Sequence, residues 1–339
     1  MPDHLVLLAP SSNRVYAGTA DVLVAAELAV LLGGGQSLPV EPVEVAGVGY
    51  LALPVPELDE ASHAALGRLS AAFALFRREQ DVLRPVRLER PDRFDDDLVT
   101  IPKYPGKTNE QFTRLLVNVT LASMDRSPTG GPDAAPLTVL DPMCGRGTTL
   151  STALILGHDA AGVDSDAKAV EAYAAFLRTY LRRHRLKHTA DVSPVRREGK
   201  SLGRRLDVGV TPERGGRAQS LTVFTGDTRQ SAALYGRRRF DAVVVDAPYG
   251  IVHASQATAS KRDRSAAGLL GEALGVWAGQ LKRGGALGLS WNTYGLTREK
   301  LTALAVDAGL EPLDEGPYLR FGHRVDASIH RDVFVARRP

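Results

Sequence analysis

Acidic residues recur in the second half of the chain, each directly after an apolar run with the character of a strand. They are Asp141, Asp164, Asp227 and Asp246. The carboxyl ends of parallel strands meet at one edge of an open α/β sheet, and ligands bind at that edge. We therefore expect these carboxylates to face a common site, where they would accept hydrogen bonds from hydroxyl and amino groups and attract positive charge.

A glycine turn follows the first of these carboxylates and leads into a helix predicted from Thr148. Gly145 and Gly147 let the backbone approach a ligand closely, and the N–H groups of a helix N-terminus suit a carboxylate or a phosphate. A dinucleotide fingerprint would have glycine or alanine where this chain has Leu150, and Asp141 would repel a pyrophosphate. An acid here attracts an ammonium group instead. A ligand that carries an ammonium group, a carboxylate and a nucleoside fits the acid, the helix N-terminus and the glycine turn together. These features therefore predict S-adenosylmethionine as the cofactor.

Two further acids stand where the nucleoside of that cofactor needs them. Asp164 lies 23 residues after Asp141, within reach of ribose hydroxyls by the geometry of dinucleotide folds. Asp227 follows the third predicted strand, where it would accept a hydrogen bond from the adenine amino group. The residues expected to bind the cofactor are Asp141, Pro142, Cys144, Gly145, Gly147, Thr148, Asp164, Ser165, Asp227, Thr228 and Asp246.

The loop Asp246-Ala247-Pro248-Tyr249 follows the fourth predicted strand and carries groups suited to methylating an aromatic amine. The lone pair of such an amine is delocalised into the ring, so the amine is a poor nucleophile. A carboxylate and a carbonyl that hold its N–H groups turn the lone pair toward the methyl, and the carboxylate can then accept a proton. Tyr249 would stack on the base. We expect Asp246, Pro248 and Tyr249 to be the catalytic residues.

This loop resembles the Asp/Asn-Pro-Pro-Tyr loop of class I methyltransferases that act on exocyclic amino groups of nucleobases, with Ala247 in place of the first proline. The segments Lys103–Glu110 and Asp141–Gly145 are similar to motifs of the tRNA guanosine N2-methyltransferases linked to a THUMP domain, which act at position ten of tRNA. The resemblance covers about residues 100–339 and implies guanosine N2 in tRNA as the methyl acceptor. A THUMP domain is not evident, and His253 stands in a stretch where the family often has an arginine.

Basic residues are concentrated between Arg178 and Arg217, where twelve Lys and Arg stand against four Asp and Glu. A local basic run on a nearly neutral protein predicts contact with a polyanion, here RNA and most simply tRNA. A solvated helix face followed by an arginine-rich disordered loop would have the same composition. The residues expected to bind the substrate are Tyr249, His253, Trp291, Asn292, Arg182, Arg183 and Arg185.

The elements that must position these residues fall into two predicted parts. Residues 1–95 are expected to form a small ferredoxin-like α+β domain, with strands at Leu5–Ala9, Val40–Val45, Gly49–Val55, Ala72–Phe76 and Val82–Leu88. Residues 96–339 alternate strand and helix, which predicts a Rossmann-like class I methyltransferase sheet, mostly parallel with one antiparallel strand. A basic insert is expected around residues 186–218, and two late strands at Tyr318–Phe321 and Arg331–Ala336.

Composition bounds the class of protein. A content of 44% hydrophobic and 24% charged residues is that of a globular chain, with a net charge of +3. The single cysteine, Cys144, excludes an internal disulfide and a cysteine-cluster metal site, and we expect no metal. The apolar run Val22–Leu32 is short and interrupted by Glu27, so we expect no membrane span. Since the first residues lack a signal peptide's basic region, we expect a cytoplasmic protein, monomeric or homodimeric.

Three other functions remain open at this point. Methylation of cytosine N4 or adenine N6 in DNA would use the same loop chemistry. N-methylation of a small molecule or peptide in secondary metabolism would need no RNA-binding module. A cofactor-binding scaffold without turnover would be consistent with Ala247 in the catalytic loop.

Overall fold

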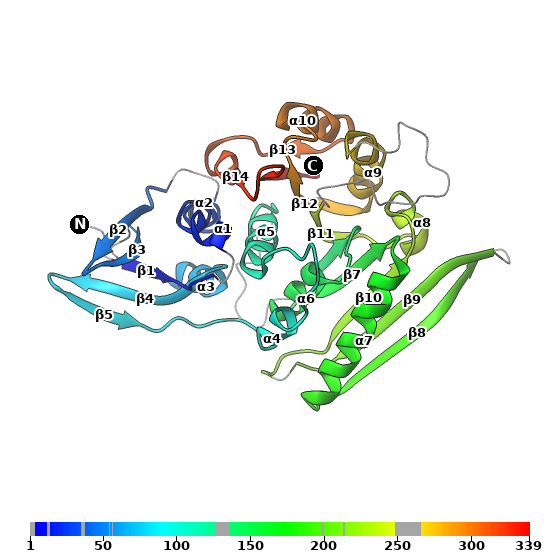
Figure 1. Cartoon of the computed structure of the whole chain (residues 1–339), viewed down its shortest axis with the longest axis horizontal. Coiled ribbons are helices and arrows are strands. Elements are labelled where there is room, and N and C mark those ends of the chain that lie inside the picture. Colours follow the sequence, from blue (N-terminus) through cyan, green and yellow to red (C-terminus); the bar gives the residue numbers. More distant parts are fainter. Residues whose placement is uncertain are drawn as a thin grey trace.

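The computed structural model describes residues 4–11, 14–34, 38–53, 55, 57–125, 136–197, 200–212, 214–247 and 266–339. These residues form a smaller sheet from the first part of the chain and a larger sheet from the rest, with helices packed between the two (Figure 1). Within the described residues, no helix is both long enough and apolar enough to cross a membrane.

The smaller sheet is antiparallel throughout, with the strand order β2-β3-β1-β4-β5. Its strands are β1 His4–Leu8, β2 Glu41–Val45, β3 Val48–Leu53, β4 Ala72–Glu79 and β5 Val82–Val86. Its helices are α1 Arg14–Ala17, α2 Ala20–Gly33 and α3 Glu60–Arg68. The five strands lie where the sequence predicts them, and α3 begins where the Asp59 carboxylate accepts a hydrogen bond from the Ser62 amide at 2.8 Å.

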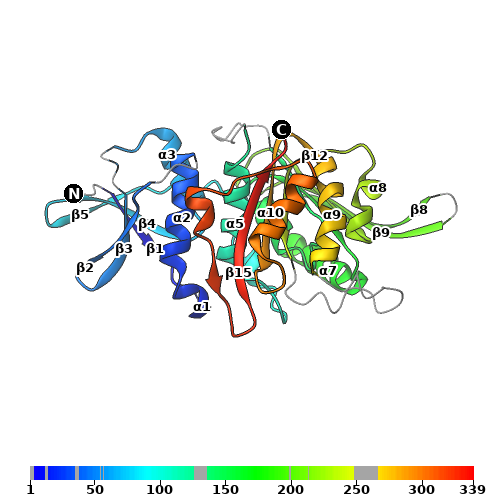
Figure 2. The ribbon, with the colours of Figure 1, turned by 90° about the horizontal axis from the view of Figure 1, so that it is seen from above.

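Helix α2 is apolar around its whole circumference because both of its sides are covered. Val24 and Leu28 pack into the core of the smaller sheet. Leu23 and Val30 pack on the other side, in the core shared with helix α5 (Glu110–Ala122) of the second part. Figure 2 shows α2 lying between the smaller sheet and α5. A helix without a polar face is expected where it is buried between two layers.

The larger sheet has five parallel strands in the order β10-β7-β6-β11-β12. They are β6 Thr138–Asp141, β7 Asp159–Asp164, β10 Gln219–Thr225, β11 Phe240–Asp246 and β12 Leu281–Asn292. The antiparallel strand β15 His330–Arg337 pairs with β12, and the short strands β13 Glu311–Pro312 and β14 His323–Arg324 pair with β15. Chain order reverses at β6, which in a doubly wound sheet is the point where ligands bind at the strand ends.

Helices cover both faces of this sheet. One face packs against α5, α6 (Thr148–Ile155) and α7 (Ala167–Arg183), and the other against α9 (Ala266–Gln280) and α10 (Arg298–Asp307). The remaining short elements are α4 Asp97–Thr100, η1 Thr228–Gln230, α8 Ser231–Tyr235 and η3 Gly316–Leu319. The strands are apolar runs without alternation because both faces are buried.

The basic insert predicted around residues 186–218 contains an ordered hairpin. Its strands, β8 His188–Arg197 and β9 Lys200–Val210, extend the larger sheet beyond β10. Because β9 runs antiparallel to β10, the sheet has a second reversed strand beside β15, and the prediction of one antiparallel strand was wrong. The missed signal was alternation, since Leu206, Val208 and Val210 are buried while the residues between them face outward.

The predicted strand at Tyr318–Phe321 was also wrong. Pro317 begins a turn of 3-10 helix in which the Arg320 amide bonds back to the Pro317 carbonyl at 3.1 Å. Tyr318 and Phe321 are buried there as anchors against the core of the second part. Proline fixes its own φ and lacks an N–H, which favours a turn over a ladder strand at this point. The strand predicted at Arg331–Ala336 is present as β15.

Candidate active site

The turn after β6 adopts a conformation that requires glycine. Gly145 has φ of +50° and Gly147 has φ of +76°, both in the left-handed region. The Cys144 amide donates to the Val163 carbonyl of β7 at 3.0 Å, and the Gly147 amide donates to the Cys144 carbonyl at 2.7 Å. The turn is thereby tied to the neighbouring strand. A Cβ at Gly145 would meet no atom within 4 Å, so the surface in front of this residue is open.

Asp164 lies at the end of β7 and connects two loops. Its carboxylate accepts hydrogen bonds from the amides of Gly145 at 2.7 Å and Asp166 at 2.8 Å. Burial raises its pKa, and the hydrogen bonds from these two amides oppose that shift. The glycine turn and the β7 loop therefore hold a common geometry. Ser165, next in the chain, is exposed.

Asp141 is buried at the end of β6, with only 2% of its surface exposed. Burial raises the pKa of its carboxyl to about 7, and the negative charges of Asp164 and Asp246 contribute to that shift. Its carboxylate accepts from the Met143 amide at 3.0 Å, and within the described part of the chain no Lys or Arg forms an ion pair with it. A cationic ligand would relieve the repulsion among these carboxylates. Among the described residues, no group of three or more His, Cys, Asp or Glu could hold a metal ion.

Asp246 ends β11, opposite Ser290 of β12 in the parallel ladder. The Ala247 amide donates to the Ser290 carbonyl at 2.9 Å, which holds the start of the predicted catalytic loop. The hydroxyl of Thr108 donates to the carboxylate oxygen Oδ2 of Asp246. The other oxygen, Oδ1, is buried and has no hydrogen-bond partner among the described residues. A buried carboxylate oxygen without a donor is costly, and it marks a place where a ligand N–H can bind.

Two site residues come from the segment Lys103–Glu110, to which sequence reasoning assigned no side-chain role. Thr108 contacts Asp246, and the Tyr104 hydroxyl lies 2.9 Å from the Thr148 hydroxyl at the start of α6. The Arg146 guanidinium lies over the Tyr104 ring, 4.9 Å from its centroid. The segment therefore covers the ends of β6 and β11. In the sequence, the similarity of this segment to a family motif was the signal that could have indicated a role in the site.

Arg331 is a third residue that sequence reasoning missed. It is 5% exposed in the buried strand β15, and its guanidinium lies 4.5 Å from the Phe112 ring centroid. Burial lowers its pKa, and the negative charge of Asp246 opposes that shift. The signal in the sequence was an arginine close to the apolar run Val333–Ala336, since buried arginines are rare unless they interact with an acid or a ring.

Two predicted cofactor residues already have partners in the protein. Asp227 accepts hydrogen bonds from the Arg229 guanidinium, at 2.6 Å for the shortest, and these bonds lower its pKa. Arg229 also pairs with Glu272 at 2.9 Å. The Thr228 hydroxyl accepts from the indole N–H of buried Trp277 at 3.0 Å. The side chains of Asp227 and Thr228 therefore stabilise the loop after β10.

Trp291 and Asn292, predicted to contact the substrate, serve the structure around β12. Trp291 is 2% exposed and its indole N–H donates to the Leu296 carbonyl at 2.8 Å. The Asn292 side-chain oxygen accepts from the His330 amide at 3.1 Å, and its amide nitrogen donates to the Ser328 carbonyl at 3.0 Å. Among the described residues, neither side chain forms a hydrogen bond with Asp246 or with the glycine turn.

The remaining predicted site residues lie in the glycine turn, in the segment after β11 and at the end of α7. Pro142 and Cys144 are buried in the turn, and burial raises the pKa of the Cys144 thiol well above its usual value. Pro248, Tyr249 and His253 lie outside the described residues. Arg182, Arg183 and Arg185 are exposed at and just beyond the end of α7. That helix has 17 residues and begins beside Asp164, so these arginines lie roughly 25 Å away from the strand ends.

Comparison with known proteins gave no match to a family model and no match to a curated protein sequence. Solved structures do match, among them SAM-dependent methyltransferases. TrmN from Thermus thermophilus is 15% identical, with 88% of this chain and 59% of that chain covered and a TM-score of 0.40. The N-methyltransferase NodS from Bradyrhizobium japonicum WM9 is 12% identical over 68% of this chain and 95% of that chain, with a TM-score of 0.39.

A third match is the magnesium protoporphyrin IX methyltransferase ChlM from Synechocystis PCC 6803, solved with bound SAM. It is 15% identical over 70% of this chain and 87% of that chain, with a TM-score of 0.38. At these identities and TM-scores, the function of this chain has to be argued from its own residues.

Proposed function

We propose that the protein is an S-adenosylmethionine-dependent N-methyltransferase that acts on an exocyclic amino group of a nucleobase. One observation carries this proposal. Asp246 and Asp141 end neighbouring parallel strands, and Asp246 presents a buried carboxylate oxygen that lacks a donor among the described residues. This oxygen can accept an N–H of an amine, while the carboxylates beside it attract a cationic cofactor.

The residues around the glycine turn fit that cofactor. S-adenosylmethionine, when bound, supplies a methyl group on a positively charged sulfur. Asp141, buried beside two other carboxylates, would hold a cationic group of the cofactor, and its raised pKa fits a site that needs positive charge. Asp164 would contact the ribose, and the open surface at Gly145 leaves room for a ligand against the backbone.

Asp246 would then act on the amine. Its Oδ1 would accept one N–H of the amino group, which would hold the nitrogen with its lone pair directed toward the methyl and less available to the ring. The nitrogen gains the methyl group and must lose one proton. Asp246 can take that proton in the role of general base. The part of the loop predicted to stack on the base, at Tyr249, is outside the described residues.

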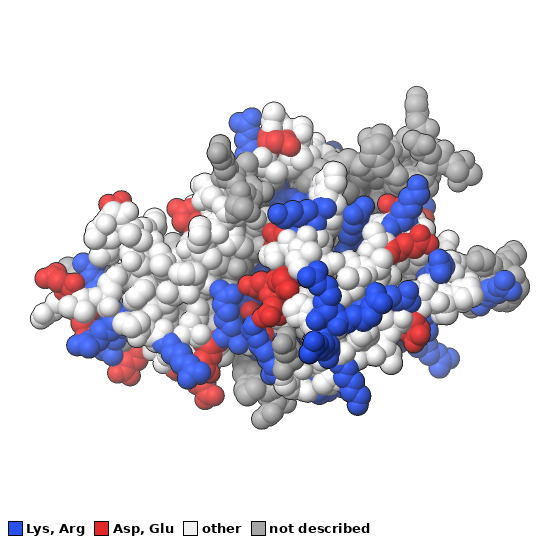
Figure 3. Space-filling model, turned by 60° about the horizontal axis from the view of Figure 1, so that its bottom comes forward, with Lys and Arg blue, Asp and Glu red and all other residues white. Residues whose placement is uncertain are grey.

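We further infer that the substrate is RNA, and most specifically guanosine N2 in tRNA, as the resemblance to the position-ten family implies. The surface supports a large anionic substrate. Figure 3 shows Lys and Arg side chains gathered on the face that carries the end of α7. Exposed residues there that form no ion pair with an acid within the described part of the chain are Arg182, Arg183, Arg185 and Lys187. A polyanion that contacts both this face and Asp246 must span roughly 25 Å, which a small molecule does not.

The two-part organisation belongs to the same proposal. We assign residues 1–95 to a ferredoxin-like module and residues 96–339 to the methyltransferase domain, with β8 and β9 as its basic insert. The modules share a buried interface between α2 and α5. Because the two modules share this core, the first module is held in a fixed position relative to the site. A module that orients the substrate would need such a fixed position.

The test is methyl transfer from tritiated S-adenosylmethionine to total RNA, DNA and a metabolite extract, side by side. We expect label in small RNA, and we expect Asp246→Asn to abolish it while calorimetry shows cofactor binding unchanged within a few-fold. If label appeared only in DNA or only in metabolites, the substrate would belong to that class and not to RNA. Cofactor binding without transfer to any fraction would indicate a scaffold, and absence of cofactor binding would overturn the proposal as a whole.

A further inference from the structure

Thr108 and Asp246 are 138 positions apart in the chain, and yet the Thr108 hydroxyl donates a hydrogen bond to one oxygen of the Asp246 carboxylate. We propose that Thr108 is a positioning residue that sets the orientation of this carboxylate and thereby favours substrate groups that carry a hydrogen, such as the proposed amine. The inference rests on the proposed function, because it assigns the residue that prepares Asp246 for its substrate.

Thr108 is itself held in place from both sides. On one side, Lys107 donates to the Val99 carbonyl at 2.5 Å and pairs with Glu110. On the other, the Asn109 side chain caps α5 by accepting from the Phe112 amide at 3.0 Å, and donates to the Ser11 hydroxyl at 3.1 Å. A side chain between two anchored residues has little freedom, so its hydroxyl offers the carboxylate a donor in a defined direction.

The two oxygens of the Asp246 carboxylate therefore have different roles. Oδ2 is bonded to Thr108, and Oδ1 is buried without a partner among the described residues. A carboxylate that receives one donor from the protein cannot turn freely about its terminal bond, and the lone pairs of Oδ1 point in a defined direction. Only a ligand atom that carries a hydrogen can satisfy them. A carbonyl oxygen or an unprotonated ring nitrogen at that place would be repelled.

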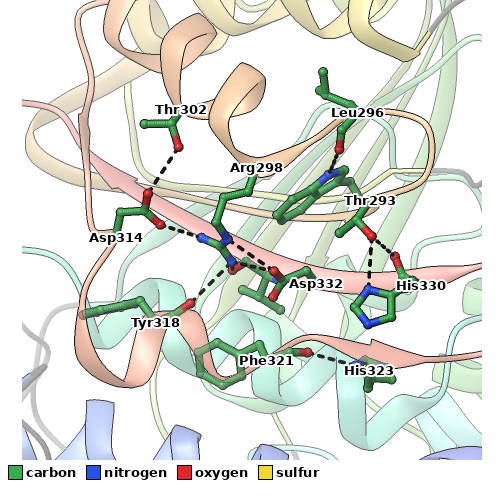
Figure 4. A network of polar contacts seen from close by, with 12 residues as sticks. Thr293, Leu296, Arg298, Thr302, Asp314, Tyr318, Phe321, His323, His330 and Asp332 are labelled. Atoms are coloured by element: carbon green, nitrogen blue, oxygen red, sulfur yellow. Dashed lines mark hydrogen bonds and ion pairs between the residues drawn. The ribbon is translucent and has the colours of Figure 1, made fainter.

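Buried Arg331 is a cation whose electrostatic environment includes the same carboxylate. It lies on β15, and Figure 4 shows how its neighbours are fixed: His330 contacts Thr293, and Asp332 pairs with Arg298 at the start of α10. The Arg298 guanidinium lies 2.7 Å from Asp332 and 2.9 Å from Asp314. The strand is thus secured on both sides of Arg331. The negative charge of Asp246 offsets part of the cost of burying the Arg331 guanidinium.

Without Thr108, we expect the carboxylate to lose its fixed orientation while the cofactor site stays intact. Asp141, Asp164 and the glycine turn make no hydrogen bond with Thr108 in the described structure. The loss should therefore appear in turnover and not in cofactor affinity. A misaligned group of this kind commonly reduces turnover by about 10- to 100-fold.

The experiment compares Thr108→Val with Thr108→Ser. Valine keeps the shape and removes the hydroxyl, and serine keeps the hydroxyl. We expect Thr108→Val to reduce kcat about 10- to 100-fold, with KM for S-adenosylmethionine and the calorimetric affinity for it within about twofold of wild type. Thr108→Ser should recover most of the loss. The matched control is Thr113→Val on the adjacent helix α5, where the lost hydroxyl donates to the Asn109 carbonyl at 3.2 Å.

Three outcomes would overturn the inference. In the first, Thr108→Val turns over like wild type. In the second, serine fails to restore activity. In the third, Thr108→Val loses cofactor affinity or unfolds at a lower temperature to the same degree as activity, which would make Thr108 a structural residue. Wild-type protein that transfers methyl to no acceptor would instead refute the proposed function, so the two failures are distinguishable.

Discussion

The Glu27 carboxylate of α2 accepts a hydrogen bond of 2.7 Å from the side-chain amide of Asn118 on α5. Both residues are buried, and the bond joins the two parts of the chain. The Ser70 amide donates to the same carboxylate at 3.1 Å. Beside this group, Arg114 forms a buried ion pair with Asp92 at 2.6 Å. The interface between the modules is therefore held by polar contacts as well as by the apolar sides of α2 and α5.

Glu27 should make the stability of the protein depend on pH. Burial raises its pKa to about 7, so between the ordinary value of 4.5 and 7 the folded state binds a proton that the unfolded state does not. Stability from this group is therefore present at low pH and is lost as pH rises toward 7. We expect Glu27→Gln to be more stable than wild type at pH 8, by up to about 3 kcal/mol, and near wild type at pH 5.

Urea unfolding at both pH values measures this effect. Glu44→Gln, which removes an exposed charge on β2, serves as the control and should leave the pH profile unchanged. An equal loss of stability in Glu27→Gln at both pH values would show that its hydrogen bonds, and not its charge, dominate.

Affinity for S-adenosylmethionine should rise with pH around neutrality. Burial raises the pKa of Asp141 to about 7, and only the ionised carboxylate attracts a cationic group. The ionised fraction grows about tenfold between pH 6 and pH 8, so the association constant should rise by up to about that factor. Calorimetric titration across this range checks the prediction. Asp141→Asn should bind weakly and without this pH dependence, and an equally steep profile in that variant would assign the effect to another group.

The two glycines of the turn should respond differently to alanine. A Cβ at Gly147 would lie 2.4 Å from the Tyr173 ring, so Gly147→Ala should unfold at a clearly lower denaturant concentration. A Cβ at Gly145 meets open space, and its left-handed backbone alone should cost about 1–2 kcal/mol. Gly145→Ala should therefore remain folded and bind cofactor poorly. Wild-type affinity in this variant would mean that the open surface at Gly145 is not part of the cofactor site.

The arginines of the basic run should divide into two groups. Arg182, Arg183 and Arg185 form no ion pair with an acid in the described structure, whereas Arg204 pairs with Glu171 at 2.9 Å and Arg205 with Asp207 at 2.7 Å. Replacing the first three by glutamine should weaken tRNA binding. It should also reduce the slope of log affinity against log salt by roughly 2, because each phosphate contact contributes about 0.7–0.9.

The matched control replaces Arg204, Arg205 and Arg214 by glutamine, since Arg214 pairs with Asp95. The net charge change is the same, but these side chains are already neutralised by acids. Equal losses in the two triple variants, measured by filter binding at several salt concentrations, would show that total charge matters and not the surface at the end of α7.

Most strands and helices could be predicted from the sequence because their signals are local. Strands β6, β7, β10 and β11 carry apolar residues toward both faces, since both faces of the sheet are covered, and the glycines of the turn are required by its backbone. The β8–β9 hairpin was missed because its charged residues outnumber the buried ones, although its second strand alternates. The 3-10 turn at Tyr318 was missed because short apolar runs do not distinguish a strand from an anchored turn.

What the sequence by itself determined was therefore the order of elements and the group of carboxylates at the strand ends, because strand termini and glycine turns follow from neighbouring residues. Only the tertiary structure decided the partners of those carboxylates. Thr108 reaches Asp246 across 138 positions, and the Gly145 amide reaches the Asp164 carboxylate across 19 positions. The physical reason is that a side chain's partners depend on the packing of segments distant in the chain, which no local pattern encodes.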